Sequence, residues 1–346
     1  MTTSRRTFLA ALGAAASAPL FNQTASSAQT PTTATRRIDI HQHFVSPSFY
    51  ATLNAKNATS PIPGLAAWKG YSPASAVEAL DRVGIATAML SITAPGVWFG
   101  DVQEARKLAR EMNEYAASKL VSAYKGRFGL FAVLPLPDVD GSMKELEYAL
   151  DTLKADGIGV LSSYEGKYLG NPLYTPLLEE MNRRRGVIYC HPFCAACGVS
   201  PTLTEAQNRG VEFVFDTTRT ILSLLQTGAV ARYPDIKFIW SHGGGTVPYI
   251  TSRLNGVGGE KLPKGVTYEL QKMYYDTAQA FNPYTMPSFR KFIPVSQIVF
   301  GTDFPLGGGS AAIVAKGLKD NGGFTDAELC AVERENALRL LPRLKA

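Results

Sequence analysis

The sequence predicts one (β/α)8 barrel over residues 36–346. Eight apolar, strand-like runs alternate with amphipathic helical stretches, and no linker-like break divides them. Most of these runs are continuously apolar, which is typical of parallel strands covered on both faces. No GxGxxG follows the first run and there is no P-loop, so the alternative of an open doubly wound sheet lacks its usual motifs.

Local signals place the individual elements. Strands are predicted over residues 37–44, 86–93, 128–135, 158–163, 187–191, 237–242, 273–278 and 298–303. Ser72 and Pro73 begin the first predicted helix and Gly84 ends it, while Asp101 begins another that ends near Gly126. Further helices are predicted over residues 140–157, 171–186, about 217–233, 283–292 and 325–341.

Residues 1–28 are not expected to belong to the barrel. The stretch SRRTFL at residues 4–9, followed by an Ala-rich run, resembles a bacterial twin-arginine export signal that could be cleaved before Gln29. The resemblance implies the twin-arginine export machinery as a partner and a periplasmic or otherwise exported location; the alternative is a basic tail. The run is too short to span a membrane, and no nearby cysteine offers a lipid anchor. Residues 29–35 are expected to be a flexible leader.

Charge and cysteine content exclude several classes. The net charge is +6, but the basic residues are scattered, so we expect no nucleic acid partner. Four cysteines in 346 residues are too few for a disulfide scaffold. Cys194 and Cys197 form a lone CxxC, for which a loop thiol pair and a short-range disulfide both stay open.

All four histidines fall at the carboxyl ends of predicted strands: His41, His43, His191 and His242. Barrel enzymes build their active sites at this face. His41 and His43 share one face of their strand because successive side chains alternate, and Gln42 between them is expected to face the helices. Neutral imidazole is the commonest metal ligand, and three imidazoles with a carboxylate suit Zn²⁺ or a similar divalent ion.

Asp303 is the expected carboxylate. It ends the eighth predicted strand, which neighbours the first in a closed barrel, and Gly301 on the same face leaves room beneath an ion. Asp39 is expected either to orient the ring of His41 or to be a buried hydrogen-bonding carboxylate, and Asp276 is a weaker candidate for the orienting role.

Four motifs together resemble the amidohydrolase superfamily: DIHQHF, CHPF, SHGGGTVPY and FGTDFP. Their order and spacing are most similar to the branch of amino-carboxymuconate-semialdehyde decarboxylase and its relatives, over residues 36 to about 342. The stretches LDRVGI, FDTTRTILSLLQTG and SITAPG are further similar to 6-methylsalicylate decarboxylase-like members.

The resemblance implies a role for each site residue. One metal would be ligated by His41, His43, His191 and Asp303. His242 would stand beside it as an acid or base. Binuclear amidohydrolases carry a carboxylated lysine at the end of the fourth strand, whereas here that strand reads IGVLSSYEG and the nearest lysine, Lys167, follows in a loop. We therefore expect one divalent ion, Zn²⁺ first and Mn²⁺ as the alternative.

Aromatic residues follow or flank the strand ends and suggest a pocket for a flat, partly apolar substrate: Phe44, Trp98, Phe99, Tyr164, Phe193, Tyr249 and Phe304. We single out Trp98 and Phe193 as substrate-binding candidates. Arg219 and Arg253 are candidates for bidentate recognition of a substrate carboxylate, with ordinary helix-surface charge as the alternative for each.

Two catalytic functions use the same ligands. The favoured one, on the resemblance, is nonoxidative decarboxylation of an aromatic or unsaturated carboxylic acid such as a hydroxybenzoate, with Asp303 or His242 delivering the proton. The alternative is hydrolysis of a lactone, amide or C–C bond by a metal-bound hydroxide, with His242 as general base. A noncatalytic metal-binding protein is a third hypothesis, opposed by the surplus of ligand groups. Relatives in this branch suggest a homodimer.

Overall fold

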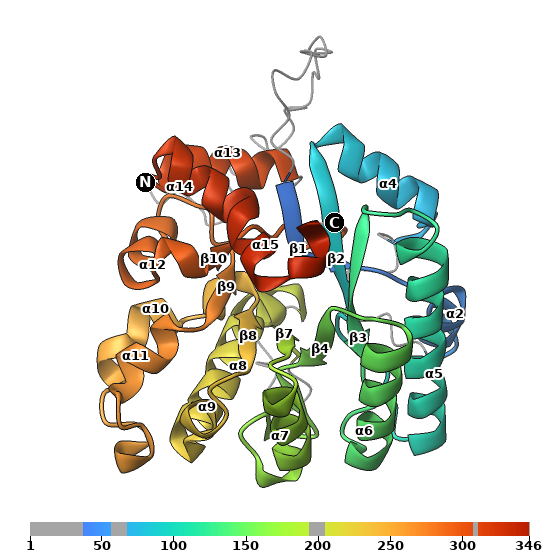
Figure 1. The fold of residues 1–346 in the computed structure, drawn as a ribbon, viewed down its shortest axis with the longest axis horizontal. Coiled ribbons are helices and arrows are strands. Elements are labelled where there is room, and N and C mark those ends of the chain that lie inside the picture. The colour runs from blue at the N-terminus through green and yellow to red at the C-terminus, as the bar shows by residue number, and fades with distance from the viewer. Residues whose placement is uncertain (1–36, 57–67, 194–204, 307–310, 346) are drawn as a thin grey trace, which may run out of the picture. The chain divides into compact units, whose positions relative to one another are not determined.

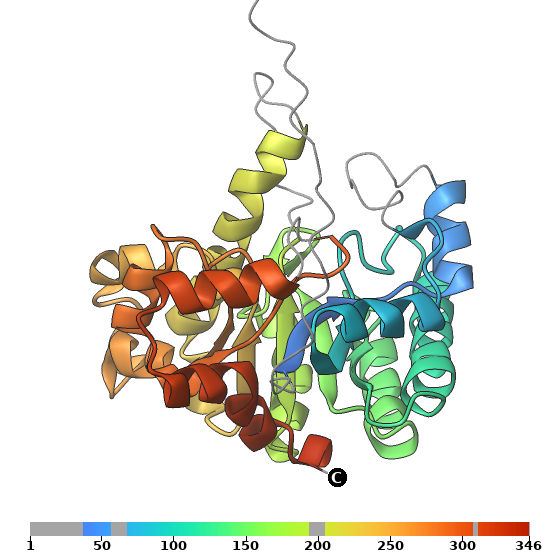
Figure 2. The same ribbon diagram turned by 90° about the horizontal axis from the view of Figure 1, so that it is seen from above.

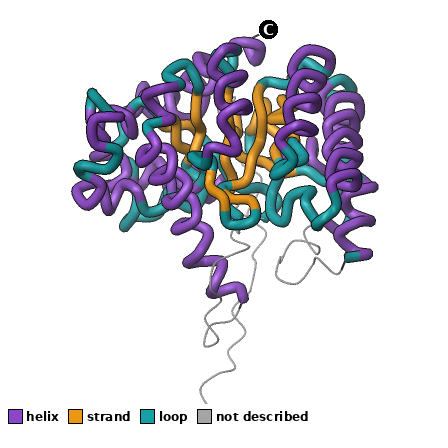
Figure 3. The backbone as a smooth tube through the Cα atoms, turned by 90° about the horizontal axis from the view of Figure 1, so that it is seen from below, coloured by secondary structure: helices purple, strands orange, loops and turns teal. Residues whose placement is uncertain are grey.

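The structure, a computed structural model, describes residues 37–56, 68–193, 205–306 and 311–345. Eight parallel strands run in the order β1-β2-β3-β4-β7-β8-β9-β10, and helices surround them (Figures 1 and 3). The strands are β1 (Arg37–His43), β2 (Ile85–Ser91), β3 (Phe128–Val133), β4 (Gly157–Leu161), β7 (Val187–His191), β8 (Lys237–Trp240), β9 (Tyr274–Asp276) and β10 (Ile298–Val299). The predicted (β/α)8 barrel is thereby confirmed.

The barrel closes where the chain leaves β10 and runs beside β1. The Ile40 N–H donates to the Phe300 carbonyl and the His43 N–H to the Phe304 carbonyl, both at 2.9 Å. The Asp303 N–H returns a bond to the His41 carbonyl at 2.9 Å. This closure places Asp303 beside both histidines of β1.

Helices of the described chain are α2 (Pro47–Ala55), α4 (Pro73–Arg82), α5 (Val102–Tyr115), α6 (Val139–Glu147), α7 (Thr175–Arg183), α8 (Glu205–Thr227), α9 (Ala229–Arg232), α10 (Val247–Ile250), α11 (Gly265–Gln271), α12 (Met286–Phe292), α13 (Ala311–Asn321), α14 (Asp326–Cys330) and α15 (Asn336–Leu340). The predicted starts hold for two of them. Ser72 forms a capping box with Ser75 ahead of α4, and Asp101 caps α5 through the Glu104 N–H.

Several boundaries differ from the predictions. The last three barrel strands end earlier than predicted, so His242 and Asp303 lie in turns beyond β8 and β10. The helix predicted from about residue 217 is α8, which begins at Glu205, extends outward from the barrel (Figure 2) and is separated from α9 by Gly228 at φ 73°. Short helices inside the loops (α2, α10 and α11), α13 and the antiparallel hairpin β5 (Ser163–Tyr164) and β6 (Lys167–Tyr168) were not predicted. Most are too short to give a periodic signal.

The barrel interior is apolar below the strand ends. One buried cluster gathers inward-facing side chains from six strands, namely Ile38, Ile40, Met89, Phe131, Val187, Tyr189, Ile239 and Val299. A second, larger cluster fills the layer between strands and helices. Phe131 and Tyr189 stack face to face in the interior, with ring centroids 5.4 Å apart and planes 8° from parallel.

A β-bulge in β1 changes which side chains face inward. The pairing of β1 with β2 shifts between Asp39 and Gln42, where three steps along β1 oppose two along β2. Ile40 below the bulge therefore packs in the interior cluster, although His41 directly after it also points inward. Bulges commonly re-aim a side chain beside an active site. The simple alternation that we assumed for this strand is wrong at this point.

Some features fall outside the described residues. These are the predicted export signal (1–28), the leader (29–35) and the CxxC cysteines Cys194 and Cys197. Within the described chain, no helix is long and apolar enough to cross a membrane.

Candidate active site

The two histidines of β1 meet at the strand end. Their Nε2 atoms lie 3.1 Å apart, and both residues are almost fully buried. The other ring nitrogen of His43, Nδ1, contacts the Ser91 hydroxyl on β2 at 3.2 Å. This contact holds the ring so that Nε2 is aimed at the centre of the barrel mouth.

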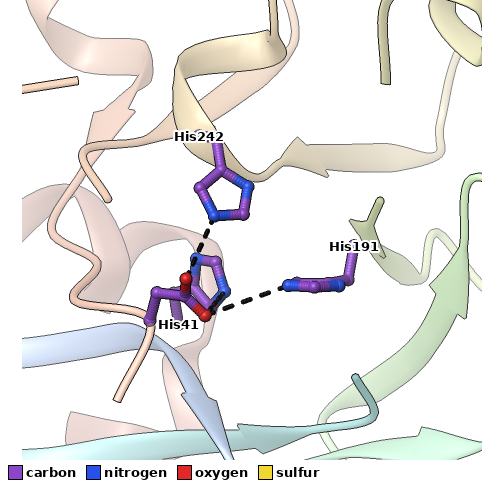
Figure 4. A group of neighbouring side chains, drawn as sticks. His41, His191 and His242 are labelled. Carbon is purple, nitrogen blue, oxygen red and sulfur yellow. Dashed lines mark hydrogen bonds and ion pairs between the residues drawn. The ribbon is translucent and has the colours of Figure 1, made fainter. Parts of the chain in front are cut away.

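Asp303 is the hub of the site. Its Oδ1 lies 3.0 Å from His43 Nε2, 3.2 Å from His41 Nε2 and 3.9 Å from His191 Nε2. Its second oxygen, Oδ2, contacts His242 Nε2 at 3.2 Å. Figure 4 shows the imidazoles of His41, His191 and His242 gathered around this carboxylate.

These donors fit a divalent metal ion. Ligand atoms about 2.1 Å from a tetrahedral Zn²⁺ lie about 3.4 Å from one another, near the separations of 3.0–3.2 Å within the group His41, His43 and Asp303. A second grouping, of His41, His191, His242 and Asp303, has ligand atoms within 4.8 Å of one another. Three Nε2 atoms face Oδ1, whereas His242 faces Oδ2, so the geometry favours the first set with His191 as its third imidazole.

Asp276, at the end of β9, organises the site from behind. Its Oδ2 lies 2.7 Å from His41 Nδ1, and its Oδ1 accepts the His242 backbone N–H at 2.8 Å. Gly301 makes this approach possible, because a Cβ there would lie 2.9 Å from the Cβ atoms of both His41 and Asp276. A carboxylate behind a metal-binding imidazole sets its tautomer and ring orientation.

Of the two roles expected for Asp39, the structure shows the buried hydrogen-bonding carboxylate rather than the partner of the His41 ring. It accepts hydrogen bonds from the Thr302 hydroxyl, the Gln42 side-chain amide at 2.8 Å and the His41 backbone N–H at 3.0 Å. The bulge in β1 places Asp39 and Gln42 together on the outward side. On that side the Gln42 side-chain amide donates to Asp39.

Burial and neighbouring charges shift the pKa values of the histidines and of Asp303 in this cluster. Burial disfavours a charged His41, but the carboxylates of Asp276 and Asp303 outweigh it and raise the pKa of His41 to about 10. Burial lowers the pKa of His43 and of His191. Burial alone would raise the pKa of Asp303, yet the charge of His41 and contacts with His191 and His242 hold it well below its usual range. The cluster thus presents an ionised Asp303 with neutral His43 and His191, the protonation states that ligate metals, whereas His41 gives up its proton when an ion binds.

His242 occupies a tight turn just after β8, with φ at 53°. Its Nε2 faces Asp303, and its buried Nδ1 has no hydrogen-bond partner within the described parts of the chain. A non-glycine residue held at positive φ is uncommon and marks a constrained position. The ring is therefore held beside Asp303, with Nδ1 available for a further hydrogen bond.

The predicted substrate-binding residues differ in burial: the two aromatic residues are half-buried and the two arginines are exposed. Phe193 and Trp98 are half-buried; Phe193 follows the His191 turn and packs on the core, and the Trp98 indole donates to Glu165 at 3.0 Å. Arg219 on α8 is exposed and its guanidinium lies 3.2 Å from Glu212. Arg253 is also exposed, in the turn that follows α10.

Sequence reasoning missed Gln279 and Phe213. The Gln279 side-chain amide donates to Asp303 Oδ2 at 3.2 Å, and the Phe213 ring lies edge-on to His191 with centroids 6.3 Å apart. Gln279 follows Asp276 by three residues, so the rule that strand ends carry site residues could have found it. Phe213 lies in the part of α8 that was not predicted to be helical.

Comparison with known proteins agrees with this geometry. The family model described as Amidohydrolase matches residues 38–343. The decarboxylase yanB of Aspergillus niger is 32% identical over 337 residues, covering 89% of this chain and 88% of that protein. The 6-methylsalicylic acid decarboxylase of Penicillium expansum is 31% identical over 334 residues, covering 89% of this chain and 97% of that protein.

A solved structure shares the fold. It is a dihydroxybenzoic acid decarboxylase from Polaromonas sp. JS666, with bound manganese and the inhibitor 2-nitroresorcinol. The TM-score is 0.72 at 23% identity, over 90% of this chain and 98% of that one. With the family model spanning nearly the whole barrel and two relatives above 30% identity, the resemblance seen in the four motifs is confirmed, and the chain belongs to the Amidohydrolase family.

Proposed function

We propose that this protein is a metal-dependent nonoxidative decarboxylase, a carboxy-lyase, of an aromatic or unsaturated carboxylic acid such as a hydroxybenzoate. The observation that carries the proposal is the convergence of His41, His43 and His191 on one oxygen of Asp303, with His242 on the other. The relatives above 30% identity are decarboxylases, one of them of 6-methylsalicylic acid, which is a hydroxybenzoate.

The site residues have two proposed roles, metal binding and proton delivery. His41, His43, His191 and Asp303 would hold a divalent ion, which would supply Lewis-acid stabilisation of negative charge. We assign Zn²⁺ first because of the imidazole-rich donor set and keep Mn²⁺ as the alternative, since a protein of the same fold holds manganese. His242 or Asp303 delivers a proton to the ring carbon that bears the carboxylate. The C–C bond then breaks, its electron pair returns to the π system that formed the new C–H bond, and CO2 leaves without any oxidant.

Substrate recognition is proposed to use the aromatic candidates Phe193, Trp98 and Phe213. Phe193 and Trp98 offer ring faces for a flat acid, and Phe213 lies close enough to His191 to join them. Arg219 and Arg253 remain the proposed partners of the substrate carboxylate. Alanine substitution of each arginine should raise KM and leave kcat nearly unchanged if it binds the ground-state carboxylate, and an unchanged KM would remove it from the proposal.

The test is a substrate panel. Protein loaded with Zn²⁺ or with Mn²⁺ is incubated with 6-methylsalicylate, dihydroxybenzoates and a set of aryl lactones, and CO2 release and lactone opening are measured. In D2O the aromatic product should carry one deuterium at the carbon that lost CO2. Lactone opening without CO2 release would refute decarboxylation and establish the hydrolase.

His242→Ala separates catalysis from metal binding. We expect it to retain one equivalent of metal and lose most turnover, because general acid–base groups contribute about 10²–10⁴-fold. Loss of metal together with turnover would make His242 a ligand and favour the second grouping of site residues.

We further propose that residues 1–28 are a twin-arginine export signal and that the mature protein is periplasmic. The support is the SRRTFL stretch with the Ala-rich run behind it. Replacing Arg5 and Arg6 by lysine should keep the protein in the cytoplasmic fraction of a bacterial host, because that route reads the arginine pair. Equal periplasmic yield of both forms would contradict the proposal. Size-exclusion chromatography of the mature protein tests the expected homodimer.

A further inference from the structure

Three strained residues meet at one oxygen of the site. Among the residues that the structure describes, six non-glycine residues have positive φ, at Lys154, Glu165, Arg185, His242, Gln279 and Asp303. The last three, at 53°, 56° and 63°, converge on Asp303 Oδ2, which His242 Nε2 and Gln279 Nε2 each approach to 3.2 Å. Such backbone conformations are energetically unfavourable and persist where the surrounding structure enforces them, commonly at functional sites.

Gln279 is the member of this group without an assigned role. It follows β9 at the mouth of the barrel, and although the residue as a whole is exposed, its amide reaches Asp303. An ionised carboxylate only accepts hydrogen bonds, so the NH2 end of the carboxamide must face Oδ2. Gln279 thus adds a neutral donor to Oδ2, while Oδ1 faces the imidazoles.

The loop around Gln279 does not depend on this side chain. The Ala280 N–H closes a turn onto the Thr277 carbonyl at 3.1 Å, and the Thr277 hydroxyl both donates to the Gly301 carbonyl and accepts the Gly301 N–H. These bonds tie the segment after β9 to the segment that carries Asp303. The left-handed conformation of Gln279 therefore has a local cause, and its side chain is free for another role.

We infer that Gln279 is a positioning residue that keeps Asp303 a one-oxygen metal ligand. A carboxylate can bind an ion through one oxygen or through both. With Oδ2 engaged by Gln279 and His242, only Oδ1 is left for the ion, and the position that Oδ2 would otherwise take stays open for the acid substrate. The inference rests on the proposed metal site but not on which reaction the site performs.

The experiment uses Co²⁺ as the probe, in the absence of substrate. Gln279→Gly removes the donor and relieves the positive φ, whereas Gln279→Met removes the donor at nearly constant side-chain length. Lys154→Gly is the matched control, since it relieves a φ of 59° at an exposed position. For each protein the visible absorption spectrum of the Co²⁺ form is recorded, and metal affinity is measured by chelator competition.

Both Gln279 variants should show the same weakened visible Co²⁺ bands, because a second carboxylate oxygen raises the coordination number. Their metal affinities should differ from that of the wild type by about 10-fold, the lower end of the range for residues that orient a ligand. Lys154→Gly should match the wild type in both measurements. The midpoint temperature of thermal unfolding of metal-free Gln279→Gly should equal or exceed that of the wild type, and this result would exclude a folding defect.

The outcomes separate the two proposals. Wild-type spectra and affinity in both Gln279 variants would overturn the role of Gln279 and leave the metal site intact. A change in Gln279→Gly alone would assign the effect to the backbone and would also overturn it. A wild-type protein that takes up no Co²⁺ would overturn the metal site, and this inference with it.

Discussion

The lower half of the barrel interior is apolar, whereas the upper half, at the carboxyl ends of the strands, is polar and charged. Below the bulge in β1, side chains such as Ile38 and Ile40 pack with Phe131 and Val299 in a dry cluster. Above it, the interior holds buried histidines and carboxylates, with two of the strained backbone positions. Tyr189 joins the halves, because its ring stacks on Phe131 and its hydroxyl donates to Asp276 at 3.3 Å.

The contrast teaches where stability and function are located. Apolar packing contributes free energy of folding without depending on metal or pH. The upper half collects buried charges, whose desolvation is costly until they are paired or metal-bound. A substitution in the lower half should therefore lower the free energy of unfolding at constant metal affinity. A substitution in the upper half should lower metal affinity at nearly constant free energy of unfolding. Substitutions in either half test this division.

His43→Gln should cause the largest change, in the upper half alone. It removes an imidazole that faces both His41 Nε2 and Asp303 Oδ1. We expect stoichiometric metal binding and turnover to fall below detection, because a three-ligand remnant with a neutral amide binds divalent ions poorly. Metal content by elemental analysis and chemical unfolding of the metal-free protein check this. Wild-type metal binding by this variant would show that His43 is not a ligand.

Phe131→Ala should act in the lower half alone. The residue is fully buried and stacked on Tyr189, so we expect a loss of about 3–5 kcal/mol in the free energy of unfolding. Metal affinity of the molecules that stay folded should change little. Denaturant unfolding with and without metal measures both quantities, and Phe131→Leu serves as a milder control. A large fall in affinity at full folding would show that the halves are coupled through Tyr189.

Asp276→Asn tests the boundary between the halves. The amide keeps the shape of the side chain but loses the charge that faces His41 Nδ1 at 2.7 Å. We expect metal affinity to drop by about 10–100-fold, the usual cost of removing a partner behind a ligand imidazole. Chelator competition measures the change. Asp39→Asn is the matched control, since Asp39 bonds the Thr302 hydroxyl rather than the His41 ring, and it should shift metal affinity less.

Asp216→Asn should give the smallest effect, seen in the pH dependence of stability. Asp216 on α8 lies outside both halves and accepts bonds from the Ser163 and Tyr168 hydroxyls at 3.0 and 2.9 Å. Burial raises the pKa of Asp216. The folded protein then binds this proton more tightly than the unfolded chain, so stability falls as pH rises from the unfolded pKa through the folded one. The slope is at most about 1.4 kcal/mol per pH unit.

Urea unfolding between about pH 3.5 and 7 measures this contribution as the difference between the two proteins. Asp216→Asn should lack the decline that the wild type shows in that window. A wild-type decline that persists in the variant would place the titrating group elsewhere.

Local sequence patterns are sufficient to predict the barrel architecture and the histidines and carboxylate of the candidate site. Apolar periodicity, helix start signals such as Ser72 and Asp101, and the placement of every histidine at a strand end are local patterns. They suffice for the barrel and for His41, His43, His191, His242 and Asp303, because parallel strands bring their carboxyl ends to one face whatever the details of packing.

The tertiary structure decided what depends on partners distant in sequence. The bulge that puts His41 on the opposite side of β1 from Asp39 follows from the pairing of β1 with β2, and no residue type in RIDIHQH marks it. The choice of Asp276 as the partner of His41 depends on β9 lying beside the closing segment, where Gly301 leaves room for both side chains. Gln279 reaches Asp303 only because two loops, joined through Thr277 and Gly301, set its backbone at positive φ. Strand register and loop conformation are long-range properties, so they select among candidates that local sequence leaves equivalent.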